Sequence, residues 1–312
     1  MRAVLTHTAS GRSVPFGAVD SREVLLLSVD FEDWHQLVRR RLGAENWREP
    51  GPALKRQTDA LLSLLDELQL RATFFILGMA ARAHPELVEA VVAHGHEIGC
   101  HGDAHLPVHT QTPQEFAADL ESARETIERL TGRRPVGYRA PAFSITREAG
   151  WAYDVLAEQG FAYDASQHDT PRIRDRAVPA SSSPHPLERT GNGAVWEFPV
   201  AVWQARGARL PVGGASYWAA MPTDLVLRGL RHAGSYPGLY LHPHELDPQP
   251  LRVHLPAGSS VAQRAHAGLR AAQRNSARRR AATVLRAIAD RFELIPYGEA
   301  HAKLSAGVHA RP

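Results

Sequence analysis

The chain has 312 residues, of which 44% are hydrophobic and 22% are charged, a composition typical of a globular protein with a sizeable buried core. Its net charge of +3 does not demand a nucleic-acid partner, and the single cysteine, Cys100, excludes an internal disulfide. We find no signal peptide, and no apolar run approaches the roughly 18–20 residues of a membrane span. We therefore expect a soluble cytoplasmic enzyme.

Strand and helix patterns alternate after a polar segment, residues 1–23, which we expect to be a flexible arm. Apolar runs predict strands at 24–29, 72–77, 97–100, 136–140, 161–164, 194–200, 238–241 and 292–296. Helical spacing and boundary residues predict helices at 54–68, 85–95, 112–132, 146–160, 222–233 and 260–290. Segments 39–52 and 170–193 are predicted to be loops.

This alternation predicts a parallel sheet, open or closed into a barrel, with its chemistry at the carboxyl ends of the strands. The polar clusters of the sequence follow predicted strands, as this arrangement requires. They are residues 30–33, residues 101–105, Arg139, Asp164 and residues 242–244.

One of these clusters has the spacing of a metal site. His101 and His105 are four residues apart, so their imidazoles can lie on the same side of one turn and share a divalent cation. A third ligand is expected from the acidic residues after the first strand, Asp30, Glu32 and Asp33. Two histidines and one carboxylate, with positions left for water, are the usual composition of a hydrolytic metal centre.

Five short motifs also occur in the order of a known family. They are D-F-E-D at 30–33, H-G-D-A-H at 101–105, Arg139-Ala140-Pro141 followed by Phe143, D-A-S at 164–166, and the strand end at 239–242. Through them, residues 25–246 resemble the NodB-type polysaccharide deacetylases, carbohydrate esterase family 4. Segments 211–214 and 241–247 further resemble the branch associated with bacterial exopolysaccharide and exosortase clusters, which is close to allantoinase-like and peptidoglycan-deacetylase-like members.

The resemblance implies a fold and a domain division. The fold is an α/β protein, a distorted (β/α) barrel with a basic C-terminal helix. Residues 24–250 would form the deacetylase domain, and residues 251–312 would form a helical extension and a last strand packed on the barrel.

The resemblance also implies roles for individual residues. Asp30 would be the general base, held ionised and oriented by Arg139. His242 would be the acid that protonates the leaving amine, kept cationic by Asp164. His244 is the alternative candidate for the acid. Pro141, Phe143, Trp34 and His244 are predicted to contact the substrate.

The metal ligands implied are His101, His105 and one of two carboxylates. Glu32 would share a face with Asp30 if the strand continues, whereas Asp33 is favoured if the chain turns after Asp30. We prefer Asp33, because its shorter side chain matches the ligand of the family. Zinc is the expected metal, and cobalt, nickel or manganese also suit this ligand set.

Two departures from the family pattern concern the site. Gly102 replaces the hydroxyl residue of the second motif, so a hydrogen bond is lost there. Gln167, His168 and Asp169 stand where an aromatic residue usually follows the fourth motif, which changes the expected sugar-binding wall.

The expected reaction is metal-dependent removal of an N-acetyl group from an acetamido sugar, in a glycan or in a lipid-linked or nucleotide-linked precursor. The alternatives are a ureide or cyclic-imide hydrolase of the same fold that needs no metal, and a non-catalytic glycan-binding subunit. Both histidines favour a metal enzyme, and intact Asp30 and Arg139 favour catalysis. The C-terminal helix lacks aromatic residues between its arginines, which argues against nucleic acid as a partner. We hypothesise instead that Arg278, Arg279 and Arg280 hold the enzyme near an anionic carrier or an anionic membrane surface.

Overall fold

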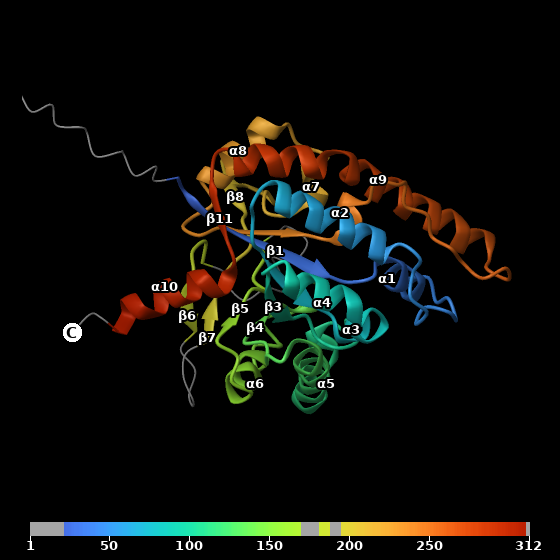
Figure 1. The fold of residues 1–312 in the computed structure, drawn as a ribbon, viewed down its shortest axis with the longest axis horizontal. Helices are drawn as coiled ribbons and strands as arrows, with labels where there is room; N and C mark the ends of the chain where they lie inside the picture. The colour runs from blue at the N-terminus through green and yellow to red at the C-terminus, as the bar shows by residue number, and fades with distance from the viewer. Residues whose placement is uncertain (1–21, 170–180, 188–194, 310–312) are drawn as a thin grey trace, which may run out of the picture.

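The computed structural model describes residues 22–169, 181–187 and 195–309 (Figure 1). Its main feature is a curled sheet that is parallel except at one edge. The strands run in the order β10 (Gly238–Leu241), β1 (Val24–Phe31), β2 (Thr73–Ile76), β3 (Glu97–Cys100), β4 (Gly137–Tyr138), β5 (Tyr163–Asp164), β7 (Val195–Glu197) and β6 (His185–Leu187). Strand β6 pairs antiparallel with β7. A separate hairpin is formed by β8 (Trp203–Ala205) and β9 (Ala208–Leu210).

Strand β1 pairs with three other strands, and it is buried along its length after Val24. The first part of β1 pairs with β11 (Glu293–Ile295), and the part that follows pairs with β10. The other edge of β1 pairs with β2, in a register that places Asp30 beside Phe75. Continuous burial matches the unbroken apolar sequence of β1, as expected for a strand covered on both faces. The prediction of a distorted barrel is confirmed by this curled parallel sheet.

Helices surround the curled sheet (Figure 1). The largest apolar core receives side chains from α2 (Leu54–Glu67), α3 (Gly78–Ala83), α4 (Pro85–Ala93), α5 (Pro113–Thr131), α7 (Ala215–Trp218), α8 (Thr223–Arg231) and the long α9 (Val261–Ala289). Helix α6 (Ala152–Glu158) packs in a second core with α5. The chain also forms α1 (Trp34–Arg41) directly after β1, α10 (Tyr297–His309) after β11, and short 3₁₀ turns η1 (Val108–Thr110), η2 (Pro141–Phe143) and η3 (Pro243–Leu246).

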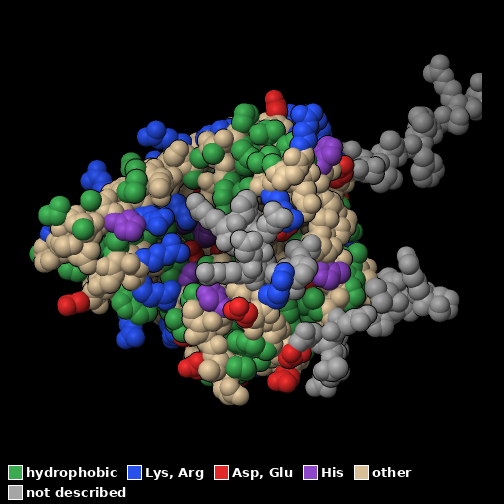
Figure 2. Space-filling model, turned by 180° about the vertical axis from the view of Figure 1, so that it is seen from behind, with side chains coloured by type: hydrophobic (Ala, Val, Ile, Leu, Met, Phe, Trp, Pro, Cys, Tyr) green, Lys and Arg blue, Asp and Glu red, His purple; other side chains and the backbone are tan. Residues whose placement is uncertain are grey.

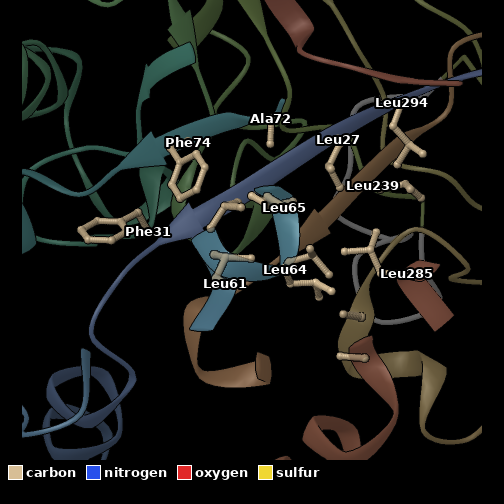
Figure 3. Packing of buried hydrophobic residues seen from close by; sticks show 14 of the residues in the cluster. Leu27, Phe31, Leu61, Leu64, Leu65, Ala72, Phe74, Leu239, Leu285 and Leu294 are labelled. Atoms are coloured by element: carbon tan, nitrogen blue, oxygen red, sulfur yellow. The ribbon is translucent and has the colours of Figure 1, made fainter. Parts of the chain in front are cut away.

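The largest apolar core lies between β1, its neighbouring strands and α2 (Figure 3). Leu61 and Leu65 of α2 point toward the sheet, where they meet side chains such as Phe74. Leu285 of α9 joins the same core, so the long helix α9 is part of the packed structure. Burial of each such leucine contributes roughly 1.5–3 kcal/mol, and this core fixes the strand ends that carry the polar side chains.

Most predicted elements are present with small shifts at their ends. Strands β3 and β10 have the predicted bounds, and α5 begins at the predicted capping box of Thr112 and Glu115 and ends at Gly132, which has a φ of 69°. Helix α6 is shorter than predicted, since residues 146–151 form turns. Helices α1, α3, α7 and α10 were not predicted. Strand β6 lies in the predicted loop 170–193, most of which, like the arm 1–21, is outside the described residues.

Two arginines of the triplet on α9 are bonded within the protein. Arg278 Nη1 donates to the backbone oxygen of Asp247 at 2.8 Å, and Arg280 Nη2 donates to Thr223 Oγ1 at 3.2 Å. Arg279 alone of the three is exposed. None of the described helices combines the length and the apolar character that crossing a membrane requires.

Candidate active site

Three side chains meet where β1 and β3 end. Glu32 follows β1, and His101 and His105 follow β3. Glu32 Oε2 lies 2.9 Å from His105 Nε2 and 3.7 Å from His101 Nε2. One ligand atom from each residue lies within 4.8 Å of the other two, and all three side chains are buried. This donor set of two imidazole nitrogens and one carboxylate oxygen fits a divalent transition metal such as zinc.

The structure places Glu32, and not Asp33, beside the two histidines, so our preference for Asp33 is corrected on this geometry. Asp33 is the N-cap of α1: its Oδ1 accepts a hydrogen bond from the backbone N–H of His35 at 2.9 Å. Its Oδ2 accepts the backbone N–H of Gly51. The backbone remains extended through Asp33 before the helix begins, so Glu32 keeps the same side as Asp30.

The protonation states of the cluster suit metal binding. Burial by itself would raise the pKa of Glu32, but His105, His101 and His242 lower that pKa well below its usual value. Burial lowers the pKa of His105 despite the neighbouring Glu32. His101 Nδ1 lies 2.8 Å from the backbone oxygen of Arg139, and a carbonyl can only accept. The proton of neutral His101 is therefore on Nδ1, which leaves the Nε2 lone pair facing Glu32.

The turn that carries the two histidines is held by two side chains, Asp119 and Arg40. Gly102 and His105 have φ values of +75° and +53°, so the turn passes twice through the left-handed region. The Asp119 carboxylate accepts the backbone N–H groups of Asp103, at 2.8 Å, and of Ala104, at 3.3 Å. Arg40 of α1 donates to the backbone oxygens of Ala104 and His105, at 2.6 Å each. These bonds fix the positions of both imidazoles.

Asp30 and Arg139 form the predicted ion pair. Arg139 Nη1 lies 2.8 Å from Asp30 Oδ1, and the arginine side chain is fully buried. The same guanidinium donates to Ser28 Oγ at 2.6 Å, the Ala165 backbone oxygen at 2.9 Å and the Tyr297 hydroxyl at 2.9 Å. Burial alone would lower the pKa of Arg139, but Asp30 and Tyr297 outweigh it and raise the pKa. Arg139 is therefore a fixed cation beside Asp30.

His242 is paired with Glu245, a residue that the sequence analysis did not identify. His242 Nδ1 lies 3.3 Å from Glu245 Oε2, and the His242 backbone N–H donates to the same oxygen at 2.9 Å. Burial opposes the charged imidazole, but Glu245, followed by Glu32 and Asp30, raises the pKa of His242 to about 9. The spacing of an N-cap residue and an acid three positions later could have indicated Glu245, since together they form a capping box at η3.

The predicted pairing of Asp164 with His242 is therefore wrong. Asp164 Oδ1 accepts the Ser166 hydroxyl at 2.6 Å, and its Oδ2 accepts the Ser166 backbone N–H at 3.2 Å. Asp164 also lies beside Glu197, its register partner on β7. Burial and the adjacent Asp164 raise the pKa of Glu197 well above its usual value, so Glu197 is a neutral acid that donates to the Asp164 carboxylate.

Of the four predicted catalytic residues, Asp30 and His242 line a pocket with a cavity volume of about 430 Å³, whereas Arg139 and Asp164 do not. Of the predicted substrate contacts, Trp34 and Phe143 line it, whereas Pro141 and His244 do not. His244 is buried and stacks on Trp34 at a centroid distance of 5.8 Å. Burial and the neighbouring His242 lower the pKa of His244 well below its usual value, which makes His242 the better acid of the two. The candidate site residues in the lining are Asp30, Glu32, Trp34, His101, His105, Phe143, Tyr240 and His242.

An aromatic wall is present despite the departure after the fourth motif. Phe143 packs edge-on against Tyr240 at 5.0 Å and against His168 at 4.7 Å between ring centroids. His168 is buried, and burial followed by Arg139 lowers its pKa to about 3, so its ring is neutral. His168 thus backs the aromatic side chains that face the pocket, a role that its sequence position did not suggest.

The fold and these residues define a (β/α)-barrel protein with a histidine–carboxylate cluster at its carboxyl strand ends. Comparison with known families agrees: residues 49–162 match the family described as polysaccharide deacetylase, and residues 169–287 match a domain of unknown function, DUF3473. These matches place a polysaccharide deacetylase domain in the chain, in agreement with its resemblance to the NodB-type polysaccharide deacetylases, carbohydrate esterase family 4. The resemblance found in the sequence is thereby confirmed.

Curated relatives match part of the chain. The peptidoglycan deacetylase-like protein FGM2 of Gibberella zeae is 30% identical over 170 residues, which cover 52% of this chain and 49% of that protein. The peptidoglycan deacetylase of Helicobacter pylori is 36% identical over 107 residues, which cover 34% of this chain and 35% of that protein. The chain therefore spans half or less of the length of these two relatives.

Solved structures match nearly the whole fold. A structure from Mycobacterium smegmatis assigned to the polysaccharide deacetylases has a TM-score of 0.63 at 18% identity, covering 95% of each chain. The Puue allantoinase has a TM-score of 0.57 at 16% identity, also covering 95% of each chain. At these identities the likeness extends to the fold alone.

Proposed function

We propose that this protein is a metal-dependent hydrolase that removes the N-acetyl group from an acetamido sugar of a glycan or glycan precursor. The observation that carries the proposal is that one pocket is lined by the Glu32–His101–His105 cluster, by Asp30 and by His242. Behind the lining, Arg139 pairs with Asp30, and Glu245 pairs with His242. Relatives named as peptidoglycan deacetylases support this reaction class.

Glu32 Oε2, His101 Nε2 and His105 Nε2 would hold the metal, for which we propose zinc. A divalent cation there lowers the pKa of water and polarises a carbonyl oxygen. The tautomer of His101 is set by the Arg139 carbonyl, so this ligand is already oriented. No rearrangement of the backbone is required for the three donors to converge.

The other residues of the pocket would move protons. Asp30, with Oδ1 engaged by Arg139, accepts the proton of the attacking water as general base. His242, whose pKa of about 9 keeps it protonated at neutral pH, donates a proton to the amine that leaves. Phe143 and Tyr240 line the pocket and offer an apolar surface to the acetyl group or the sugar ring.

A ureide hydrolase is the second candidate, since the similar fold of an allantoinase shows that the architecture is not restricted to one reaction. The compact ligand cluster and the cationic His242 favour amide hydrolysis with a metal. A non-catalytic glycan-binding subunit would have no need for the buried Asp30–Arg139 pair, whose burial is costly unless the charges are matched.

Acetate release tests the proposal. The purified protein is offered acetamido-sugar oligomers and ureides, each before and after treatment with a chelator and after zinc is restored. We expect acetate from the sugars, its loss with the chelator and its recovery with zinc. Ureide turnover that is indifferent to the chelator would contradict the proposal, and binding of the glycan without any turnover would identify a non-catalytic subunit.

A further inference from the structure

Three arginines face the pocket that contains the candidate metal cluster. Arg41 comes from the last turn of α1, and Arg270 and Arg274 come from α9. Figure 2 shows Lys and Arg side chains gathered beside a hollow in which His side chains are visible, toward the end of the molecule formed by α9. Two helices far apart in sequence thus bring cationic groups to one concave site.

These three arginines lack an acidic partner, in contrast to several other arginines of the described structure. Arg56 pairs with Asp247 at 2.9 Å, Arg82 with Asp103 at 2.6 Å, and Arg286 with Glu67 at 2.8 Å. Among the described residues, neither Arg41, Arg270 nor Arg274 forms an ion pair within 4.0 Å. Arg270 Nε donates to His266 Nε2 at 3.3 Å, and Arg274 Nη1 donates to Ser216 Oγ, both neutral contacts.

The acidic residues of the pocket cannot neutralise these arginines. Only two acidic side chains line it among the described residues, Asp30 and Glu32. Asp30 is bonded to Arg139, and Glu32 faces His101 and His105. The approach to the cluster therefore carries an excess of positive charge, which a concave low-dielectric site focuses toward an incoming ligand.

We infer that the natural substrate carries an anionic group, a carboxylate or a phosphate, near its acetamido group, and that Arg41, Arg270 and Arg274 bind this group. The inference rests on the proposed function, which it deepens by naming the substrate class. A guanidinium offers a planar fork of N–H donors that matches the oxygens of carboxylate and phosphate. Seating an anion would also relieve the repulsion between the three like charges.

An anionic glycan fits this arrangement better than an anionic membrane surface. The three arginines line a concavity shared with Glu32 and His105, so a group bound there lies next to the candidate metal ligands. Arg278 and Arg280, by contrast, do not line this concavity, and each is bonded to another segment of the protein.

The test uses two exposed arginines and a matched control. Arg41 and Arg270 are exposed, so replacing both by glutamine should not affect folding. Arg274 is left intact, because Ser216 connects it to Glu245 of the His242 pair. Arg279→Gln removes the same charge from an exposed position of α9 that does not line the pocket.

Acetate release is measured on three substrates that differ in charge: a neutral N-acetylglucosamine oligomer, a muropeptide-free glycan containing N-acetylmuramic acid, and an N-acetylglucosamine oligomer that carries a phosphate. We expect wild-type kcat/KM to favour at least one anionic substrate over the neutral one. The Arg41→Gln, Arg270→Gln double variant should lower this preference by about tenfold, a typical effect of losing two charge-assisted contacts. Arg279→Gln should leave the preference unchanged, and the preferred anionic substrate identifies carboxylate or phosphate.

The inference would be overturned if kcat/KM for the neutral oligomer equals or exceeds that for both anionic substrates and the double variant has the same values. The proposed function would still stand in that case. Binding of the same three glycans, measured by calorimetry on metal-loaded protein, does not require turnover. If no substrate releases acetate but the anionic glycans bind, and bind about tenfold more weakly to the double variant, the anion site is supported and the proposed reaction fails. Equal binding to wild type and double variant overturns the site.

Discussion

The His101 imidazole donates its Nδ1 proton to the backbone oxygen of Arg139, 2.8 Å away, while the guanidinium of Arg139 holds Asp30. One residue therefore positions a candidate metal ligand through its backbone and the candidate base through its side chain. A substitution at position 139 would leave the carbonyl in place, so it should disturb Asp30 more than His101.

Asp30→Asn should keep the metal and lose most turnover. The amide preserves the shape of the carboxylate but cannot accept the water proton, and a general base typically contributes about 10²–10⁴-fold to the rate. Acetate release measured beside metal content by elemental analysis checks this expectation. An Asp30→Asn protein that retains full activity would show that Asp30 is not the base.

Glu32→Ala and Asp33→Ala should have opposite consequences. Glu32→Ala should strip the metal and abolish activity, because Glu32 supplies the carboxylate of the cluster. Asp33→Ala should keep the metal and instead lower stability by about 0.5–2 kcal/mol, the usual cost of losing a helix N-cap. Metal stoichiometry and urea unfolding distinguish the two, and the reverse pattern would restore Asp33 as the ligand.

Glu245→Gln should shift the pH dependence of the reaction. Burial opposes the charged form of His242, and Glu245 contributes most to raising its pKa to about 9. The acid works only when protonated, so the rate of the wild type should fall as the pH rises through about 9. Without the Glu245 charge the pKa of His242 falls, and the alkaline limb of the kcat profile should move to lower pH.

The control for this shift is Glu158→Gln, which removes a negative charge from an exposed position at the end of α6. Its alkaline limb should coincide with that of the wild type. If Glu245→Gln and the wild type have the same pH dependence of kcat, the fall in kcat at alkaline pH does not reflect loss of the His242 proton.

Gly102→Ser should weaken the metal site, although it restores the hydroxyl residue usual in the family. The φ of +75° strains any L side chain, and a Cβ at this position would lie 2.8 Å from Asp119 Oδ2. Asp119 holds the backbone of the turn that carries both histidines, so its displacement should lower zinc affinity. Gly95→Ser is the control, since Gly95 has a φ of +76° with no atom within 4 Å of its added Cβ. Both variants should lose roughly 1 kcal/mol of stability or more, and only Gly102→Ser should lose zinc in a competition titration.

Tyr297→Phe should reduce kcat with little change in metal content. The Tyr297 hydroxyl accepts a hydrogen bond from Arg139 Nη2 at 2.9 Å, and the phenylalanine ring would leave this buried donor without its partner. The cost to stability should be about 1–3 kcal/mol. Thermal unfolding and acetate kinetics on zinc-loaded protein check both effects, and an unchanged kcat would show that Asp30 needs no support from this residue.

The sequence predicts the fold well because its signals are local and consistent. The unbroken apolar run of β1 and the Thr112 capping box each specify their element within a few residues. Helix α1 was missed although its N-cap is local: Asp33 accepts the backbone N–H of His35, but this aspartate was interpreted as a metal ligand. The aromatic and charged residues of α1 give no clear helical period by themselves.

The site was predicted less completely, because the partner of each polar side chain depends on how the strand ends and the turns after them lie in space. His101, His105, Asp30 and Arg139 occur in motifs, and the structure brings them together. The choice between Glu32 and Asp33 depended on where the chain turns, which neither residue reveals. The partner of His242 is Glu245 rather than Asp164, because Asp164 is satisfied by Ser166 and Glu197.

The bond between Tyr297 and Arg139 joins residues 158 positions apart, and β11, directly before Tyr297, completes one edge of β1. During synthesis, the strands bearing Asp30, His101 and Arg139 leave the ribosome well before this last strand. The guanidinium that orients Asp30 would lack one of its partners until β11 docks. The orientation of Asp30 should therefore be completed only late in the synthesis of each molecule. Fusions or truncations that disturb the C-terminal helix α10 should alter the position of Asp30, near the other end of the chain.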